Sequence, residues 1–150
     1  METPRLSSLY QQLILEHYRN PRNKAEMDEK TVEIHMANPV CGDEIRLQLR
    51  IEGDQIAEAK FVGQGCSISQ AAISMMTAKL QGASLSDAEG LAERFTALMH
   101  GDTEVAKDRS LGDLRALQGV SKFPVRIKWA LIGFDALQEA LKKHAAEGPR

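Results

Sequence analysis

The sequence predicts an α+β fold, in which a small three-stranded antiparallel sheet carries helices packed largely on one of its faces. Residues 32–62 alternate apolar and polar side chains through three successive segments, the last two joined at Gly53-Asp54. Apolar residues recur at helical spacing before this region and again after it. No internal repeat or low-complexity tract divides the 150 residues, so we expect a single domain over residues 1–150.

Three strands are expected, at residues 32–37, 45–51 and 56–62. Apolar side chains occupy every second position in each, which places them on one face of a half-buried sheet. Because no helix separates the segments, we expect neighbouring strands to pair as an antiparallel meander.

Helices are expected on both sides of the meander in the chain. The first is stopped by the segment Asn20-Pro21-Arg22-Asn23, because Pro21 disfavours the helical conformation in the residue before it. Ser84 or Ser86 can cap the third helix, and Pro124 is well placed to start the last one. The expected helices cover residues 6–18, 67–80, 85–99 and 125–143, with a charged loop at 101–109, a short helical turn at 111–117 and a frayed tail at 145–150.

Composition excludes several classes of function. A formal net charge of −2 gives no long-range attraction for nucleic acid or for an anionic membrane. No window reaches the ~18 apolar residues of a membrane span, and the first residues lack the apolar core of a signal peptide. We therefore expect a cytoplasmic protein. Its two cysteines are then expected to be reduced and available as metal ligands or sulfur carriers, or else buried as small apolar residues.

Two segments contain residues suited to metal or sulfur chemistry. Residues 38–43 read Asn-Pro-Val-Cys-Gly-Asp and form the turn between the first two strands, so Cys41 and Asp43 can point to one place. Cys66 lies at an expected helix N-terminus, where the helix dipole favours negative charge and therefore a thiolate. Two thiolates and a carboxylate make an incomplete tetrahedral zinc set, or part of an iron site.

Each segment alone has a simpler interpretation. Glycine and aspartate favour turns on their own account, so Cys-Gly-Asp by itself can be an ordinary turn. Gly63 and Gly65 before a helix also occur in phosphate-binding loops, but the third glycine of the dinucleotide fingerprint is replaced here by Ile68.

Taken together, the two segments resemble the hallmark stretches of the U-type iron–sulfur scaffold family, known as SufU and IscU. Residues 38–43 match Asn-Pro-x-Cys-Gly-Asp, and residues 63–69 match Gly-x-Gly-Cys-x-Ile-Ser. The likeness runs from Leu9-Tyr10 to residues 123–128, and residues 85–120 resemble the insertion of the SufU branch.

The resemblance implies a SufE/IscU-like α+β domain in which Cys41, Asp43 and Cys66 gather at one edge. There they would hold zinc, iron or a transient iron–sulfur cluster. It also implies that Cys41 and Cys66 are candidate acceptors of persulfide sulfur from a cysteine desulfurase, with other cluster-assembly proteins as further partners.

One position departs from the family pattern. The family has a third cysteine near the start of the last helix, where this chain has Trp129, whose indole offers no lone pair to a metal. We expect Trp129 to lie beside the site, with Arg126 as a contact for a partner or a persulfide, or as an exposed helix-start residue. His35 is the histidine best placed to replace the missing ligand. Alternatively, three ligands leave zinc an open position, or two subunits of a homodimer share one cluster.

These observations leave three functional hypotheses. The first is a scaffold or sulfur acceptor in iron–sulfur cluster assembly, at most a zinc-dependent sulfurtransferase. The second is a desulfurase-binding regulator that no longer accepts sulfur. The third is a cysteine hydrolase with Cys66 as nucleophile, which lacks a credible histidine partner close to either cysteine motif in the sequence.

Overall fold

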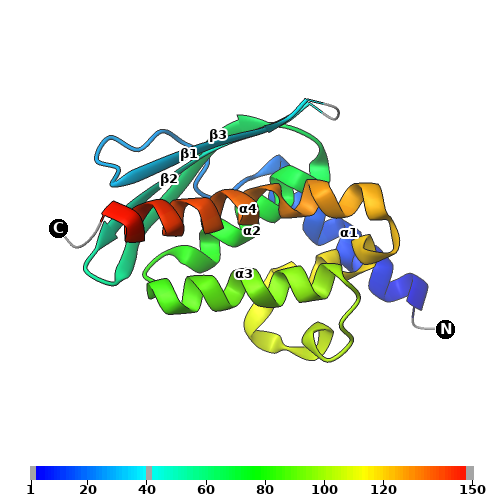
Figure 1. The fold of residues 1–150 in the computed structure, drawn as a ribbon. Coiled ribbons are helices and arrows are strands. Elements are labelled where there is room, and N and C mark those ends of the chain that lie inside the picture. The colour runs from blue at the N-terminus through cyan, green and yellow to red at the C-terminus, as the bar shows by residue number, and fades with distance from the viewer. Residues whose placement is uncertain (1–2, 40–41, 148–150) are drawn as a thin grey trace.

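The computed structural model describes residues 3–39 and 42–147 (Figure 1). In chain order the elements are α1 (Thr3–Arg19), β1 (Val32–Asn38), β2 (Asp43–Glu52), β3 (Gln55–Gln64), α2 (Ser67–Leu80), α3 (Leu85–Met99), the 3-10 helices η1 (Val105–Lys107) and η2 (Arg109–Lys122), and α4 (Pro124–Glu147). None of the helices in these described ranges is long and apolar enough to cross a lipid bilayer.

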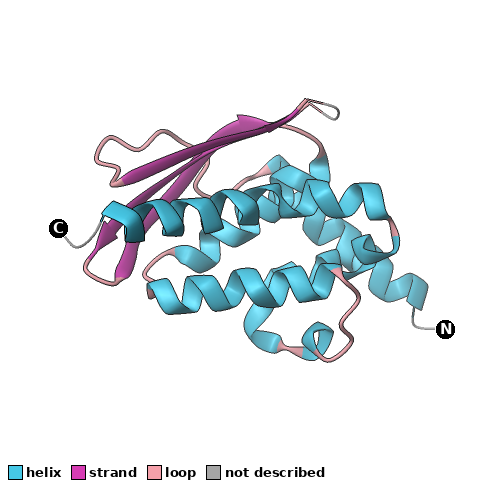
Figure 2. Cartoon of the chain, in the orientation of Figure 1, coloured by secondary structure: helices cyan, strands magenta, loops and turns pink. Residues whose placement is uncertain are grey.

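The sheet is a three-stranded antiparallel meander in the order β1-β2-β3. Figure 2 shows the helices gathered on one side of it, with α2 and α4 nearest the strands. The predicted α+β architecture is therefore confirmed, and the observed strands extend the predicted ones by at most two residues at each end.

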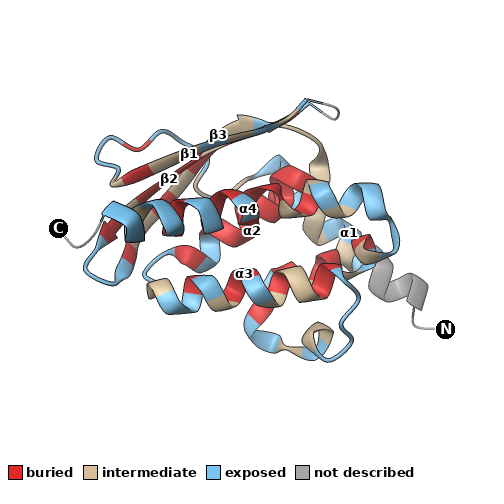
Figure 3. Cartoon of the chain, viewed as in Figure 1, coloured by how far each residue is buried: buried red, intermediate tan, exposed pale blue. Residues whose placement is uncertain are grey.

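The core lies between the sheet and the helices (Figure 3). In β2 the side chains of Ile45, Leu47 and Leu49 are fully buried on the helix side. Helix α2 is buried along most of its length, because it lies between the sheet, α1 and α4. Met75 and Met76 are both buried in this core, as the sequence predicts.

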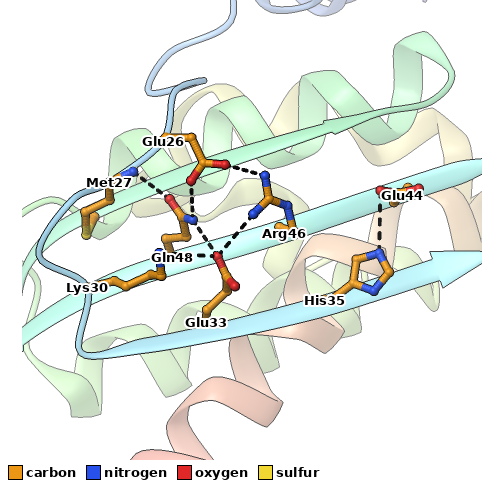
Figure 4. A network of polar contacts seen from close by, with 8 residues as sticks. All are labelled: Glu26, Met27, Lys30, Glu33, His35, Glu44, Arg46 and Gln48. Carbon is orange, nitrogen blue, oxygen red and sulfur yellow. Dashed lines mark hydrogen bonds and ion pairs between the residues drawn. The ribbon is translucent and has the colours of Figure 1, made fainter.

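The other face of the sheet is partly covered by the connector between α1 and β1 (Figure 4). This connector starts beside β3, where the Phe61 N–H donates to the Asn23 carbonyl at 3.0 Å. It then reaches β2, where the Met27 N–H donates to Gln48 Oε1 at 2.7 Å. Gln48 is fully buried beneath it, although its position in the alternating pattern lies on the outer face of the sheet.

Two regions differ from the sequence-based expectation. The helical turn expected at residues 111–117 extends to the whole of η2, interrupted at Gly112, whose φ of 55° and ψ of −130° are non-helical. Leu111, Leu114 and Leu117 are each fully buried, so core packing stabilises this irregular segment. Helix α4 continues to Glu147 where fraying was expected from residue 145, consistent with the high helix propensity of alanine at 145–146.

Candidate functional site

The two motif segments meet at one end of the sheet. In the antiparallel register Asn38 pairs with Asp43 across the β1–β2 turn, and Glu44 pairs with Gln64 at the end of β3. The start of β2 and the start of α2 are therefore neighbours, although they are more than 20 residues apart in the chain.

Asp43 and Cys66 are in direct contact at this junction. The Cys66 N–H donates to Asp43 Oδ1 at 2.9 Å, and Cys66 Sγ lies 4.0 Å from Asp43 Oδ2. Asp43 is only 1% exposed, because its position in β2 is on the helix side of the sheet, whereas Cys66 is half-buried. The expectation that these two side chains come together is met.

Cys66 occupies the N-cap of α2. Its sulfur accepts a hydrogen bond from the Ser69 N–H at 3.4 Å, as serine or aspartate does at this position in other helices. The sulfur therefore sits at the N-terminus of α2, where it satisfies one of the N–H groups that have no partner within the helix.

Gly63 and Gly65 allow the end of β3 and the start of α2 to pack closely against the start of β2. A Cβ atom on Gly63, whose φ is +148°, would lie 2.1 Å from the Glu44 carbonyl oxygen, and one on Gly65 would lie 2.4 Å from Asp43 Oδ1. Both distances are far below contact, so larger residues would separate the two segments. This explains in physical terms why glycine stands at both positions before Cys66.

Cys41 lies outside the described residues, so its approach to Asp43 and Cys66 stays a prediction. Within residues 3–39 and 42–147, no three His, Cys, Asp or Glu side chains are grouped to hold a metal ion. A complete metal site therefore requires Cys41, a ligand from a partner, or both.

His35 does not serve as the missing ligand, and that suggestion is wrong. His35 pairs with Arg46, and its Nε2 lies 3.5 Å from Glu44 Oε1 on the outer face of the sheet (Figure 4). Asp43 is on the opposite face, since side chains alternate along a strand. The same alternation is already visible in the sequence, and it excludes His35 as a metal ligand beside Asp43.

A groove opens beside the site and ends at the first turn of α2. Its volume is about 580 Å³, and Ser67 and Ile68, the residues after Cys66, form part of its wall. Arg126 lines it too, with its guanidinium 4.6 Å from the centre of the Phe123 ring. The remaining lining residues come from α1 and η2, and they are Tyr10, Gln11, Ile14, Leu15, Ala116, Gly119, Val120 and Lys122.

Trp129 lies in the second turn of α4 and is half-buried. It is therefore not fully enclosed in the core, as expected. Its position beside Cys66 stays a prediction.

Sequence reasoning missed a second polar cluster. His17 is 3% exposed, with Nδ1 2.8 Å from Ser74 Oγ and Nε2 2.9 Å from Asp113 Oδ2. Its spacing from Leu13 and Ile14 on the apolar face of α1 was the available signal. Ser74 is fully buried and accepts the Arg22 N–H at 2.8 Å, so this Ser–His–Asp chain joins elements and offers a substrate no access.

The chain matches known proteins over nearly all of its length. It is 46% identical over 138 residues to the zinc-dependent sulfurtransferase SufU of Bacillus subtilis (strain 168), covering 92% of both chains. It is 36% identical over 145 residues to the iron–sulfur cluster assembly scaffold protein IscU of Streptococcus pyogenes serotype M1, covering 97% of this chain and 90% of that one.

The fold is also known. The N-terminal part of a nitrogen-fixing NifU-like protein from Brucella abortus superposes with a TM-score of 0.82 at 18% identity, covering 93% of this chain and 96% of that one. The model of the NifU-like N terminal domain matches residues 9–130. With Asp43 and Cys66 in contact and relatives of this identity and coverage, the chain belongs to the NifU-like N-terminal domain family, which confirms the resemblance seen in the sequence.

Proposed function

We propose that this protein acts in cytoplasmic iron–sulfur cluster assembly, as a zinc-holding acceptor of persulfide sulfur from a cysteine desulfurase. The observation that carries the proposal is the contact between the Asp43 carboxylate and the Cys66 thiol at the N-terminus of α2. The 46% identity to the Bacillus subtilis sulfurtransferase supports sulfur acceptance as the specific role.

The two described donors suit a zinc ion. Zinc bonds thiolate at about 2.3 Å and carboxylate oxygen at about 2.0 Å, so tetrahedral angles place two such donors about 3.5 Å apart. Cys66 Sγ and Asp43 Oδ2 are 4.0 Å apart, so a small side-chain adjustment would bring both onto one ion. We propose that Cys41, two residues before Asp43 in the chain, supplies the third donor.

Because Trp129 stands in place of the third family cysteine, the proposed donor set has three members, Cys41, Asp43 and Cys66. Structural zinc sites are closed by four protein ligands, whereas reactive sites keep one position open. A bound zinc ion would hold its cysteine ligands in the thiolate form. We therefore propose a reactive zinc site rather than a purely structural one.

The proposed transfer needs one nucleophilic thiolate, from Cys66 or Cys41. It attacks the terminal sulfur of the desulfurase persulfide, forming a new S–S bond while the original S–S bond breaks. The desulfurase cysteine leaves as a thiolate, so no outside oxidant or reductant is consumed. At Cys66, the Ser69 N–H 3.4 Å from Sγ would donate a hydrogen bond to the attacking sulfur.

The groove beside the site supports desulfurase docking on this face. Its wall combines apolar side chains, including Leu15 and the half-exposed Phe123, with the cations Lys122 and Arg126. No described residue lining it is acidic. A partner surface that is apolar and acidic would fit, and Arg126 would then contact that partner.

Mass spectrometry after incubation with a cysteine desulfurase and cysteine tests the proposal. We expect the protein to gain the mass of one or more sulfur atoms, removed again by a thiol reductant. Cys41→Ser and Cys66→Ser variants identify the acceptor, since the variant lacking it gains no sulfur. Wild-type protein that gains none under conditions where the desulfurase turns over would overturn the proposed role.

Trp129, in place of the third family cysteine, favours one alternative. The protein would bind the desulfurase and alter its turnover without accepting sulfur. Changed desulfurase activity with no added mass on Cys41 or Cys66 would identify this regulator. A cysteine hydrolase is disfavoured, because within the described residues Cys66 has no histidine at hydrogen-bond distance.

A further inference from the structure

We propose that Ser69 is a positioning residue, which fixes the Asp43 carboxylate so that one oxygen faces the Cys66 thiol and stays available to a metal ion. The inference rests on the proposed function, because it concerns how this chain presents Asp43 to zinc. It goes further in assigning the task to a residue that is not itself a ligand.

The two oxygens of Asp43 have different surroundings. Oδ1 accepts the Cys66 N–H at 2.9 Å and the Ser69 O–H at 3.1 Å. Among the described residues, Oδ2 has only the Cys66 thiol near it, at 4.0 Å. Within the part of the chain that the structure describes, no Lys, Arg or His forms an ion pair with this carboxylate. The donors thus hold one oxygen and leave the other directed at the sulfur.

Ser69 contacts both members of the pair. It is fully buried, and its hydroxyl lies 3.1 Å from Asp43 Oδ1 and 3.1 Å from the Cys66 carbonyl oxygen. A hydroxyl has one hydrogen, and the charged acceptor forms the stronger bond, so we assign that hydrogen chiefly to Asp43. The Ser69 N–H caps Cys66 Sγ at 3.4 Å, so one residue sets the distance between carboxylate and thiol.

Gly65 limits movement of the carboxylate from the other side. A Cβ atom at this position would lie 2.4 Å from Asp43 Oδ1 and 2.6 Å from Ser69 Oγ. The hydrogen bond between Ser69 and Asp43 therefore occupies the space next to Gly65. A methyl group there would have to displace the carboxylate, the hydroxyl or both.

Zinc affinity measured by competition with a chelator tests the proposal. Loss of an outer hydrogen-bond partner of a metal ligand weakens binding about 10–100-fold, and we expect about tenfold for Ser69→Ala. Ser74→Ala is the matched control, because Ser74 is an equally buried serine on α2 whose hydroxyl bonds His17 instead. We expect Ser74→Ala to lower the thermal unfolding midpoint and to leave zinc affinity unchanged.

Two further readouts separate positioning from general destabilisation. In the cobalt-substituted protein, Ser69→Ala should change the visible d–d bands, which report the ligand geometry, while Ser74→Ala should not. In an Asp43→Asn background, Ser69→Ala should cause no further loss of affinity, because the group that it positions is already gone.

Gly65→Ala keeps the hydroxyl and disturbs the same carboxylate, so it replaces Ser69→Ala if that variant does not fold. We expect weakened zinc binding and altered cobalt bands from it too. Zinc affinity in Ser69→Ala equal to wild type, or the same loss with and without the Asp43 carboxylate, would overturn the inference. Wild-type protein that binds no zinc would instead contradict the proposed function.

Discussion

Two clusters of polar side chains lie on opposite faces of the sheet and balance their charges differently. The outer cluster consists of Glu26, Glu33, Arg46 and Gln48 (Figure 4), and the inner cluster consists of Asp43, Cys66 and Ser69. Arg46 contacts both glutamates of the outer cluster, so the carboxylates there have a cation from the chain itself. The inner cluster has a carboxylate and a thiol but no cation among the described residues.

This difference in charge balance indicates the role of each cluster. The outer cluster is complete as folded, and it fastens the α1–β1 connector to the sheet through Gln48. In the inner cluster the described residues offer the 1%-exposed Asp43 carboxylate only neutral donors, although a buried charge without a partner is costly. A cation from outside the chain would complete it, which agrees with a metal-binding role.

Removing the sulfur of the inner cluster should have the largest effect on metal binding. Structural zinc is worth about 10–16 kcal/mol over four ligands, so one ligand carries roughly 3–4 kcal/mol. Cys66→Ser should therefore lower zinc affinity by about 100-fold or more, measured against a chelator at fixed pH. Arg46→Gln in the outer cluster should leave it unchanged. Equal losses of zinc affinity in the two variants would mean that the inner cluster does not differ from the outer cluster in binding the metal.

Adding a thiol to the inner cluster should strengthen zinc binding, by a smaller amount than the loss expected on removing the Cys66 sulfur. Water can take the vacant position in the wild type, so Trp129→Cys should gain about 2 kcal/mol and raise zinc affinity by more than about tenfold. The metal-free variant should be no more stable than wild type, because thiol for indole leaves a void. Trp129→Ala is the control, since it removes the indole without adding a ligand.

Equal zinc affinity in Trp129→Cys and Trp129→Ala would contradict the assignment of this position to the metal site. Affinity as high in the wild type as in Trp129→Cys would mean that another donor already completes the site. His35 is not that donor, because it lies on the outer face of the sheet.

The sequence predicted the strands because they depend on a local pattern, and it predicted the meeting of Asp43 with Cys66 because the two motif segments resemble those of a known family. Alternation fixes which side of a strand is buried, and a glycine-bounded turn fixes where the strand ends. The same alternation assigns Gln48 to the outer face, but it does not reveal that the connector folds back and buries it. That burial depends on a long-range contact with Met27, which no periodicity encodes.

The burial of His17 and the length of η2 were missed for a related reason. A histidine on an apolar helix face is ambiguous until its partners are known, and Ser74 and Asp113 lie 57 and 96 residues away in the chain. Residues 109–122 form a 3-10 segment with a positive φ at Gly112, so their buried leucines do not follow the α-helical period.

Gln70 is a buried polar residue that belongs to neither the inner nor the outer cluster. It lies in α2, four residues after Cys66, is 3% exposed, and both polar atoms of its amide have no hydrogen-bond partner among the described residues. Leaving such a group unpaired costs about 1–3 kcal/mol, so Gln70→Leu, of similar volume, should stabilise the metal-free protein by about 1–2 kcal/mol. Urea unfolding measures this change, and we expect unchanged zinc affinity. Destabilisation by this variant would show that the amide has a partner that stabilises the fold.

The smallest expected effect comes from the outer cluster and depends on pH. The hydrogen bonds from Gln48 and then from Arg46 hold the pKa of Glu26 below its usual value of 4.5. The folded state therefore favours the carboxylate form, so Glu26 contributes its stabilisation fully above pH 4.5 and loses it as the pH falls through the lower folded-state pKa. Glu26→Gln should lower stability modestly at neutral pH and have no effect in acid below that pKa. Urea unfolding at both pH values checks this, with Glu29→Gln as the control. Glu29 lies in the same connector, and its side chain forms no ion pair or hydrogen bond within the described residues.

A difference between Glu26→Gln and wild type that persists in acid would mean that Glu26 stabilises the connector through packing. Charge pairing would then not be what fastens the connector to the sheet.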